Sequence, residues 1–268
     1  MTDSSTPAAS VDRNDGALQT FLSKPISALV LGILGFGVAG GVVVQALLTL
    51  RDLSIPLADT MNRSLLSTIS VVPWWVDPVT LQPQTVLGLK APYAAVAIGL
   101  WIVSVTALAV ASSLYWWHSS TERAGLFPPA DHLARCCVLA IGAGITLVAV
   151  EFLIPVDGWF GWAVIGIVAG VAATLLPAAV AIVTDGRSIS GAAVWAGRQF
   201  DTPAWIYAVI AVLFLARVRQ LLVEVYFQAG EPMDLFVVLA TIAFGLLYAK
   251  ISLSFYEWIE DISEDSHT

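Results

Sequence analysis

The chain has 268 residues, of which 58% are hydrophobic and 12% are charged, and its mean hydropathy is +0.83. Soluble domains average about 25% charged residues, so this composition excludes a water-soluble globular fold. The formal net charge of −8 argues against a nucleic-acid partner, and two cysteines exclude a disulfide scaffold. We therefore expect an all-α polytopic membrane bundle, whose first partner is the lipid bilayer.

Six stretches are long and apolar enough to cross a bilayer, which takes about 20 residues at a rise of about 1.5 Å each. They are residues 26–50, 91–117, 136–154, 158–183, 203–227 and 235–256. The first stretch follows an acidic, Ser-rich leader and is longer than the apolar core of a signal peptide, so we expect a retained helix. The third, fifth and sixth stretches contain ionisable residues.

The basic residues favour one orientation of these spans. With the N-terminus inside, the cytoplasmic side holds six lysines and arginines, or seven with Lys250, and the outer side holds three. The cytoplasmic six are Arg13, Lys24, Arg123, Arg135, Arg187 and Arg198. The positive-inside rule therefore predicts a multi-pass protein of the cell membrane with both termini in the cytoplasm.

Two polar tails flank the spans. Residues 1–14 form a polar tail that we expect to be disordered, and residues 257–268 form an acidic one. This acidity, with only three lysines against nine arginines, resembles the proteome bias of extremely halophilic archaea. The alternative is an ordinary acidic tail in a GC-rich organism.

Residues 51–90 form the one sizeable extramembrane loop that we expect, on the outer side. Apolar residues at helical spacing between Met61 and Val72 predict a short surface helix, which Pro73 and two tryptophans then end. Tryptophan suits the headgroup layer, so we expect an interfacial anchor. The alternative is a lid over the outer mouth of the bundle for a small ligand or a partner.

An amphipathic segment precedes three of the spans. One lies in residues 17–22 before Pro25, another in residues 189–200 before Pro203, and a shorter one in residues 130–135. The apolar stripe of the second consists of Ile189, Ala193, Ala196 and Phe200. We therefore expect three repeats of an in-plane helix plus a membrane hairpin, with unrelated hairpins as the alternative.

The segment Asp185-Gly186-Arg187-Ser188-Ile189-Ser190-Gly191-Ala192-Ala193, with Phe200 and Pro203 opening the next span, resembles a pattern in poorly characterised six-helix membrane proteins of archaea and bacteria. These include the membrane domain attached to some glycerophosphodiester phosphodiesterases. The match covers residues 181–256, with an echo at 15–50. The resemblance implies the fold and a membrane location. It implies no catalytic residues, because the phosphodiesterase chemistry of those proteins belongs to a separate soluble domain.

Signatures of catalysis are missing from the sequence. It contains no G-x-S-x-G, no H-E-x-x-H and no phosphate-binding loop, so we expect a non-enzyme without a cofactor. His118 and His132 fall in one cytoplasmic loop with Glu122 and Asp131. Their spacing matches no known metal site, and we expect a solvated loop rather than a bound metal. The Cys136-Cys137 pair reads as two small buried hydrophobes.

The candidate site is a cluster of charges within the outer half of the bilayer. Glu151, Arg217 and Arg219 each fall about 21–24 Å along their spans from the inner face. Gln45 and Glu224 lie a little further out. A charge near the bilayer centre costs about 2.5–3.5 kcal/mol on insertion scales, which favours pairing of Glu151 with one of the arginines in the bundle interior. The alternative is that both arginines extend to the outer headgroups.

Two functions follow from these features. The first is a non-enzymatic interaction or scaffold component, with a membrane-protein partner or a homo-oligomer. It fits the small-residue pairs, which we expect to serve helix contacts within the chain and, as the alternative, contacts between chains. These pairs are Gly37 with Gly41, Ala140 with Gly144, and Gly166 with Gly170. The second function is a permease or lipid-handling protein, in which the charged cluster lines an outward-facing cavity for a polar solute or an anionic headgroup.

Overall fold

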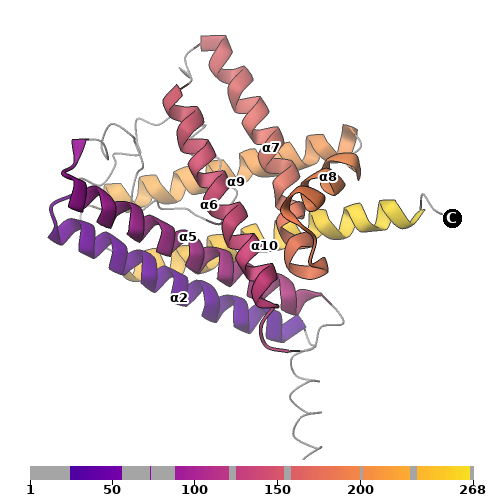
Figure 1. Ribbon diagram of the computed structural model, residues 1–268, viewed down its shortest axis with the longest axis horizontal. Helices are drawn as coiled ribbons and strands as arrows, with labels where there is room; N and C mark the ends of the chain where they lie inside the picture. Colours follow the sequence, from indigo (N-terminus) through magenta and orange to yellow (C-terminus); the bar gives the residue numbers. More distant parts are fainter. Residues whose placement is uncertain are drawn as a thin grey trace, which may run out of the picture.

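A computed structural model describes residues 25–55, 73, 88–120, 125–153, 158–199, 202–229 and 234–265. Within these ranges the chain forms seven helices and no strand (Figure 1). In chain order they are α2 (Pro25–Asp52), α5 (Ala91–Ser119), α6 (Ala130–Leu153), α7 (Gly158–Asp185), α8 (Ile189–Gln199), α9 (Thr202–Gln228) and α10 (Asp234–Asp265).

Six of these helices, all except α8, are long and apolar enough to cross a membrane. The predicted all-α fold with six spans is therefore confirmed. The expected short helix between Met61 and Val72 and the amphipathic segment in residues 17–22 lie outside the described residues.

Two helices run well beyond their predicted ends. α6 begins six residues early, at Ala130, because no glycine or proline interrupts residues 130–136 and two prolines lead into the first turn. α10 continues nine residues past 256, and the fully buried Ile259 shows that its apolar stripe continues too. We expected residues 130–135 to form a short amphipathic segment before the span, as part of a threefold repeat. They are instead the first turns of α6, so the structure differs from the expected repeat at this point. α8 is a separate short helix.

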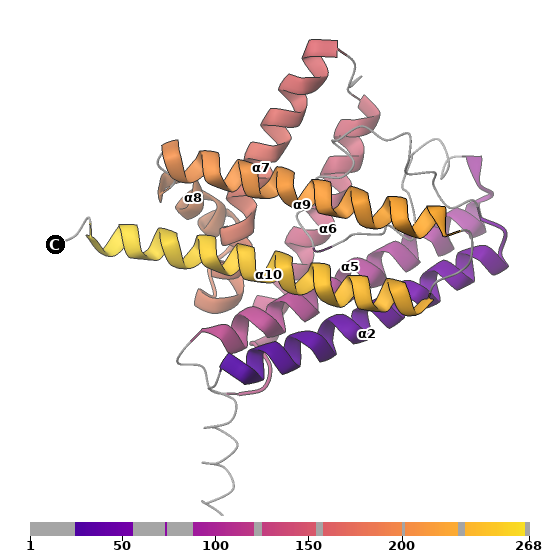
Figure 2. The ribbon, with the colours of Figure 1, turned by 180° about the vertical axis from the view of Figure 1, so that it is seen from behind.

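The helix α7 is the centre of the bundle. It contacts α5, α6, α8, α9 and α10, and 67% of the residues in its most apolar stretch are buried. In both views α2 runs beside α5, and α9 and α10 are inclined to this pair (Figures 1 and 2). The hairpin of α6 and α7 leans away from them. In α6 only 11% of the corresponding stretch is buried, so this helix is the least covered of the six.

The α2, α5 and α10 helices pack closely because small residues let their backbones approach. A Cβ at Gly40 would lie 3.0 Å from the Val238 Cα, and one at Gly245 would overlap the Phe36 ring. Trp116 of α5 adds a hydrogen bond, since its Nε1 donates to the Ala249 carbonyl at 2.9 Å. Such close approach is typical of helices in lipid, where van der Waals packing takes over from the hydrophobic effect.

Other small residues divide between the inside and the outside of the bundle. A Cβ at Gly144 would lie 2.7 Å from Trp101, and one at Gly170 would lie 2.6 Å from Trp205. These contacts lie within the chain, as expected. At Gly41 and Gly166, no atom of the described residues beyond the glycine's own stretch of helix lies within 4 Å of the Cβ position. Two of the predicted glycine pairs therefore leave one member open on the surface.

Aromatic residues mark the two ends of α9. Trp205 and Tyr207 lie near its start and are exposed, and Tyr226 lies near its end. Tyr207 and Tyr226 are separated by a helix length of about 28 Å, which is close to the thickness of the hydrocarbon core. Aromatic residues prefer both membrane interfaces, so their positions agree with α9 as a span.

The Gly245→Ala variant should lower the unfolding temperature of the protein in lipid nanodiscs. The added methyl group overlaps the Phe36 ring, and such overpacking costs about 1–3 kcal/mol. Each kcal/mol corresponds to about 2–4 °C in a chain of this size. Gly41→Ala is the matched control, because its Cβ position is open and alanine favours the helix. Equal effects of the two variants would contradict this account of the packing.

Candidate functional site

Polar and aromatic side chains from α6, α7, α8 and α10 meet where α7 ends and α8 begins. We call this group the α8 junction. It consists of Asp131, His132, Arg135, Thr184, Asp185, Gly186, Arg187, Trp195, Tyr256 and Glu260. α5 ends beside it, since the rings of Trp117 and His132 lie 6.5 Å apart in an edge-to-face arrangement.

A glycine turn separates α7 from α8. Gly186 has a φ of +68°, the left-handed conformation that commonly ends a helix and that side chains disfavour. Ser188 then caps α8, because the Gly191 N–H donates to the Ser188 Oγ at 3.1 Å. The segment Asp185-Gly186-Arg187-Ser188 is therefore a helix stop followed by a helix start, which redirects the chain.

The Asp185 carboxylate is held by donors from two helices and the turn. Thr184 and Tyr256 donate to its Oδ1, both at 2.9 Å, and the Arg187 Nε donates to its Oδ2 at 3.0 Å. The Tyr256 hydroxyl also lies beside Glu260 one turn further along α10, so its single hydrogen is shared between two carboxylates. A negative charge at the carbonyl end of α7 is opposed by the helix dipole, so these donors stabilise it there.

Two aromatic contacts extend this network onto α8. The Arg187 guanidinium lies over the Trp195 ring, 4.7 Å from its centroid. The Trp195 ring packs in turn on Tyr256, with centroids 5.7 Å apart. A cation–π contact at a partly exposed position contributes about 0.5–1 kcal/mol. The same arginine thus ties the turn to α7 through Asp185 and to α8 through Trp195.

α6 supplies donors to the unpaired carbonyls at the end of α7. The His132 Nδ1 lies 3.0 Å from the Val183 carbonyl oxygen, and the Arg135 Nη1 donates to the Gly186 carbonyl at 2.6 Å. The Arg135 Nη2 donates to Asp131 on its own helix at 2.9 Å. The last carbonyls of a helix lack partners within it, so these donors fix α6 against α7.

The chemistry of the α8 junction is that of a clamp between helices. Its carboxylates, hydroxyls and guanidinium groups bond to one another and to backbone carbonyls. Within the described ranges, no three histidine, cysteine or acidic side chains gather closely enough to hold a metal ion. The arrangement thus sets the relative positions of α6, α7, α8 and α10.

The candidate cluster predicted from the sequence lies near the opposite end of the spans, in the second halves of α2 and α9. Arg217 is exposed and its Nη1 donates to the Gln220 Oε1 at 2.6 Å, which places both on one face of α9. Gln45 is exposed on α2, and Glu224 is half-buried.

Arg219 points the other way from Arg217. Its side chain is buried, with 6% of the residue exposed, and it shares the inward face of α9 with Leu215 and Val223. The side chain of Glu151 lies outside what the structure describes, so its pairing with Arg217 or Arg219 stays a prediction. Of the two arginines, only Arg219 lies in the interior.

The histidines of the expected loop belong to helices instead. His118 lies in the last turn of α5 and is buried, with its Nε2 2.8 Å from the Leu126 carbonyl oxygen. His132 lies in the first turns of α6. The expectation of a solvated loop is therefore wrong for both residues, because each ring bonds to a backbone carbonyl. Cys136 is buried and Cys137 is half-buried.

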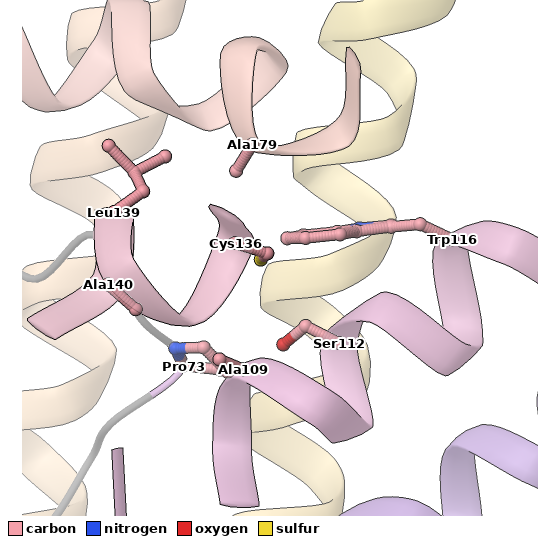
Figure 3. Close-up of a pocket in the computed structure, with 8 residues that line it drawn as sticks. All are labelled: Pro73, Ala109, Ser112, Trp116, Cys136, Leu139, Ala140 and Ala179. Atoms are coloured by element: carbon pink, nitrogen blue, oxygen red, sulfur yellow. The ribbon is translucent and has the colours of Figure 1, made fainter. Parts of the chain in front are cut away.

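A small cavity lies between α5, α6 and α7 (Figure 3). Its lining is Pro73, Ala109, Ser112, Trp116, Cys136, Leu139, Ala140 and Ala179. Its volume is about 10 Å³, near the least that holds one water molecule, so it has no room for a substrate. Pro73 comes from the connection between α2 and α5 and is buried at the level of the second half of α5. This position differs from the surface position that we expected for it.

Only some residues of the α8 junction could be predicted from the sequence. The Asp185-Gly186-Arg187 segment carries the family resemblance, but its partners are distant along the chain. Two pairs at i,i+4 spacing near span ends, Asp131 with Arg135 and Tyr256 with Glu260, are the signal that points to the partners.

The fold defines an all-helical protein with six helices that can cross a membrane. A comparison of the chain with protein families, with curated proteins and with solved structures finds no match. The resemblance to the membrane domain attached to some glycerophosphodiester phosphodiesterases therefore stays a prediction.

The Gly186→Ala variant should destabilise the α8 junction strongly. Its Cβ would lie 2.5 Å from the His132 Nε2, and its φ of +68° would be strained in alanine. Strained left-handed residues cost about 1–3 kcal/mol, before the clash is counted. Thermal unfolding in nanodiscs measures the loss. Gly197→Ala on α8 is the control, since its Cβ position is open; a loss as large as that of Gly186→Ala would argue against a special role of the turn.

Proposed function

We propose that the chain is a non-enzymatic interaction component of the cell membrane, with both termini in the cytoplasm. The distribution of basic residues supports the orientation. Arg135, Arg187 and Arg198 lie at the end of the bundle that contains α8, whereas Arg51 and Lys90 lie at the other end. The positive-inside rule assigns the richer end to the cytoplasm.

The observation that carries this proposal is the bare face of the α6–α7 hairpin. Val138 and Ile145 on α6 are 60% and 55% exposed, and Ile167 on α7 is 68% exposed. Two glycines, Gly142 and Gly166, lie among these residues with open space at their Cβ positions. Glycine on a membrane helix lets another helix backbone come close. A transmembrane helix of a partner protein is therefore the occupant that this face suits.

The α8 junction supports the same function. It fixes the end of α7 to α6, α8 and α10, so the hairpin projects from a clamped base. A fixed base holds an exposed hairpin in one orientation toward a partner. Because the groups of the junction bond to one another, they serve this positioning and leave recognition to the hairpin.

Photo-cross-linking in cells tests the proposal. p-Benzoylphenylalanine in place of Val138, Ile145 or Ile167 should give a discrete protein adduct on irradiation. The control is Phe214 on α9, which is 53% exposed and already aromatic, and which should react with lipid only. Gly166→Leu should remove the adduct formed at Ile167, because the bulky side chain keeps the partner backbone away. The absence of adducts at all three hairpin positions, or equal adducts at Phe214, would refute it.

A second candidate function is a permease or a lipid-handling protein, and the burial of Arg219 favours it. A buried cation in a membrane helix is costly, so it points to an anionic group or a polar path in the interior. An anionic headgroup or a polar solute would be the cargo.

Anionic lipid tests this second function. Nanodiscs of phosphatidylglycerol, compared with phosphatidylcholine, should raise the unfolding temperature of the wild type. Arg219→Gln should remove this gain, whereas Arg217→Gln, two residues away on the exposed face, should keep it. If Arg217→Gln alone removed the gain, the anion would be a surface headgroup and the interior site would be excluded.

A further inference from the structure

We propose that the connection between α2 and α5 is a re-entrant loop, which carries Pro73 from one side of the membrane deep between α5, α6 and α7 and then returns to that side. This inference is independent of the partner proposed for the hairpin. It starts from the position of Pro73, which is the one residue between Ile55 and Gly88 that the structure describes.

α2 and α5 form an antiparallel hairpin. A Cβ at Gly32 would lie 2.9 Å from the Tyr115 ring, and one at Gly35 would lie 3.3 Å from Ala111. As α2 advances, its contacts thus move back along α5, and Figure 1 shows the two helices side by side. The end of α2 therefore lies beside the start of α5, and the connection leaves and rejoins the bundle at this one end.

Pro73 lies far from this end of the bundle. It lines one small cavity with residues of three helices. Among them, Ala109 is 18 residues beyond the start of α5, which is about 27 Å along the helix. Cys136 is six residues after the start of α6 and Ala179 is six residues before the end of α7, so each lies about 9 Å from that helix end. All three helices therefore place Pro73 nearer to the α8 junction than to the ends of its own connection.

This position lies inside the membrane. The 29 residues of α5 span about 43 Å, whereas the hydrocarbon core is about 30 Å thick. A point about 27 Å along α5 is therefore within the core and past its middle. The chain has to cross the middle once to reach Pro73 and once more to reach Gly88. The 15 residues of this return can span about 50 Å when extended, so the chain is long enough.

The surroundings of Pro73 suit backbone that is not part of a helix. Such backbone is tolerated at membrane depth where protein buries it or where it lines a water-filled space. Pro73 is buried, and proline has no N–H group that would need a partner. Small side chains line most of the cavity and leave room for another segment of backbone between the helices (Figure 3). They are Ala109, Ser112, Cys136, Ala140 and Ala179.

Cysteine cross-linking of the full chain in membranes tests the position of Pro73. The variant Pro73→Cys with Cys137→Ser retains Cys136, which lines the same cavity. A short, membrane-permeant bifunctional thiosulfonate should join its two thiols in most chains, and mass spectrometry of the digested protein identifies the link. The matched control is Pro73→Cys with Cys136→Ser. It retains Cys137, the next residue of α6, which does not line the cavity, so it should give little product.

Labelling with a membrane-impermeant maleimide is the second measurement. In a chain without the two native cysteines, the thiol introduced by Pro73→Cys should stay unlabelled from either side of the membrane. Lys90→Cys is the control, because Lys90 is exposed just before α5 begins and should be labelled from one side. The side that labels Lys90→Cys is the side from which the loop enters.

Two results would overturn the proposal. One is a cross-link that forms equally with Cys137 or with neither cysteine. The other is labelling of Pro73→Cys as complete as that of Lys90→Cys, as in a surface loop. If the proline variant fails to fold, hydrogen exchange of the wild type decides. The amides beside Pro73 should exchange far more slowly than that of the exposed Gly88, and equal rates would refute a re-entrant loop.

Discussion

The carboxylate of Asp185, at the carbonyl end of α7, is the group on which the α8 junction depends. The helix dipole opposes a negative charge there, and three hydrogen-bond donors surround the carboxylate. Those donors come from Thr184, Arg187 and Tyr256, that is from α7, the turn and α10. Because α7 is the central helix, holding its end also fixes the helices packed along it.

The two ends of the α6–α7 hairpin are held in opposite ways. At its base, side chains of α6 bond to carbonyls at the end of α7. Further along, α6 has little cover and open glycine positions face outward. The proposed contact with another membrane protein rests on these two features, the bonded base and the exposed length of α6. The cavity next to Cys136 has room for about one water molecule.

Hydropathy alone predicted the six long helices, since about 20 apolar residues can hardly form anything else in lipid. Hydropathy misplaced the start of α6 and the end of α10, because a helix continues for as long as backbone hydrogen bonds or side-chain packing stabilise it. In α10, the buried Ile259 supplies such packing beyond the predicted end. Arg217 and Arg219 lie at a similar distance along their span from the inner face, and the sequence analysis therefore assigned both to one cluster. Their spacing of two residues nevertheless turns them to opposite faces, and only the packing of α9 decides which face is inside.

The α8 junction escaped sequence analysis for a different reason. Tyr256 and Asp185 are 71 residues apart, and no local pattern states which span ends lie side by side. A glycine before an arginine indicates a turn, but it does not indicate the histidine that fills the space beside it. Pairing between distant segments requires the packing of whole helices to be known.

The buried position of Pro73 has a consequence for the order of assembly during biosynthesis. This residue belongs to the connection between α2 and α5, yet it lines one cavity together with side chains of α6 and α7, which are synthesised later. α2 and α5 can pack together as soon as both are inserted, through glycine contacts such as Gly35 against Ala111. Pro73 has to be in place before α6 and α7 close over it. Docking of the α6–α7 hairpin therefore encloses Pro73, a residue that is synthesised before either helix.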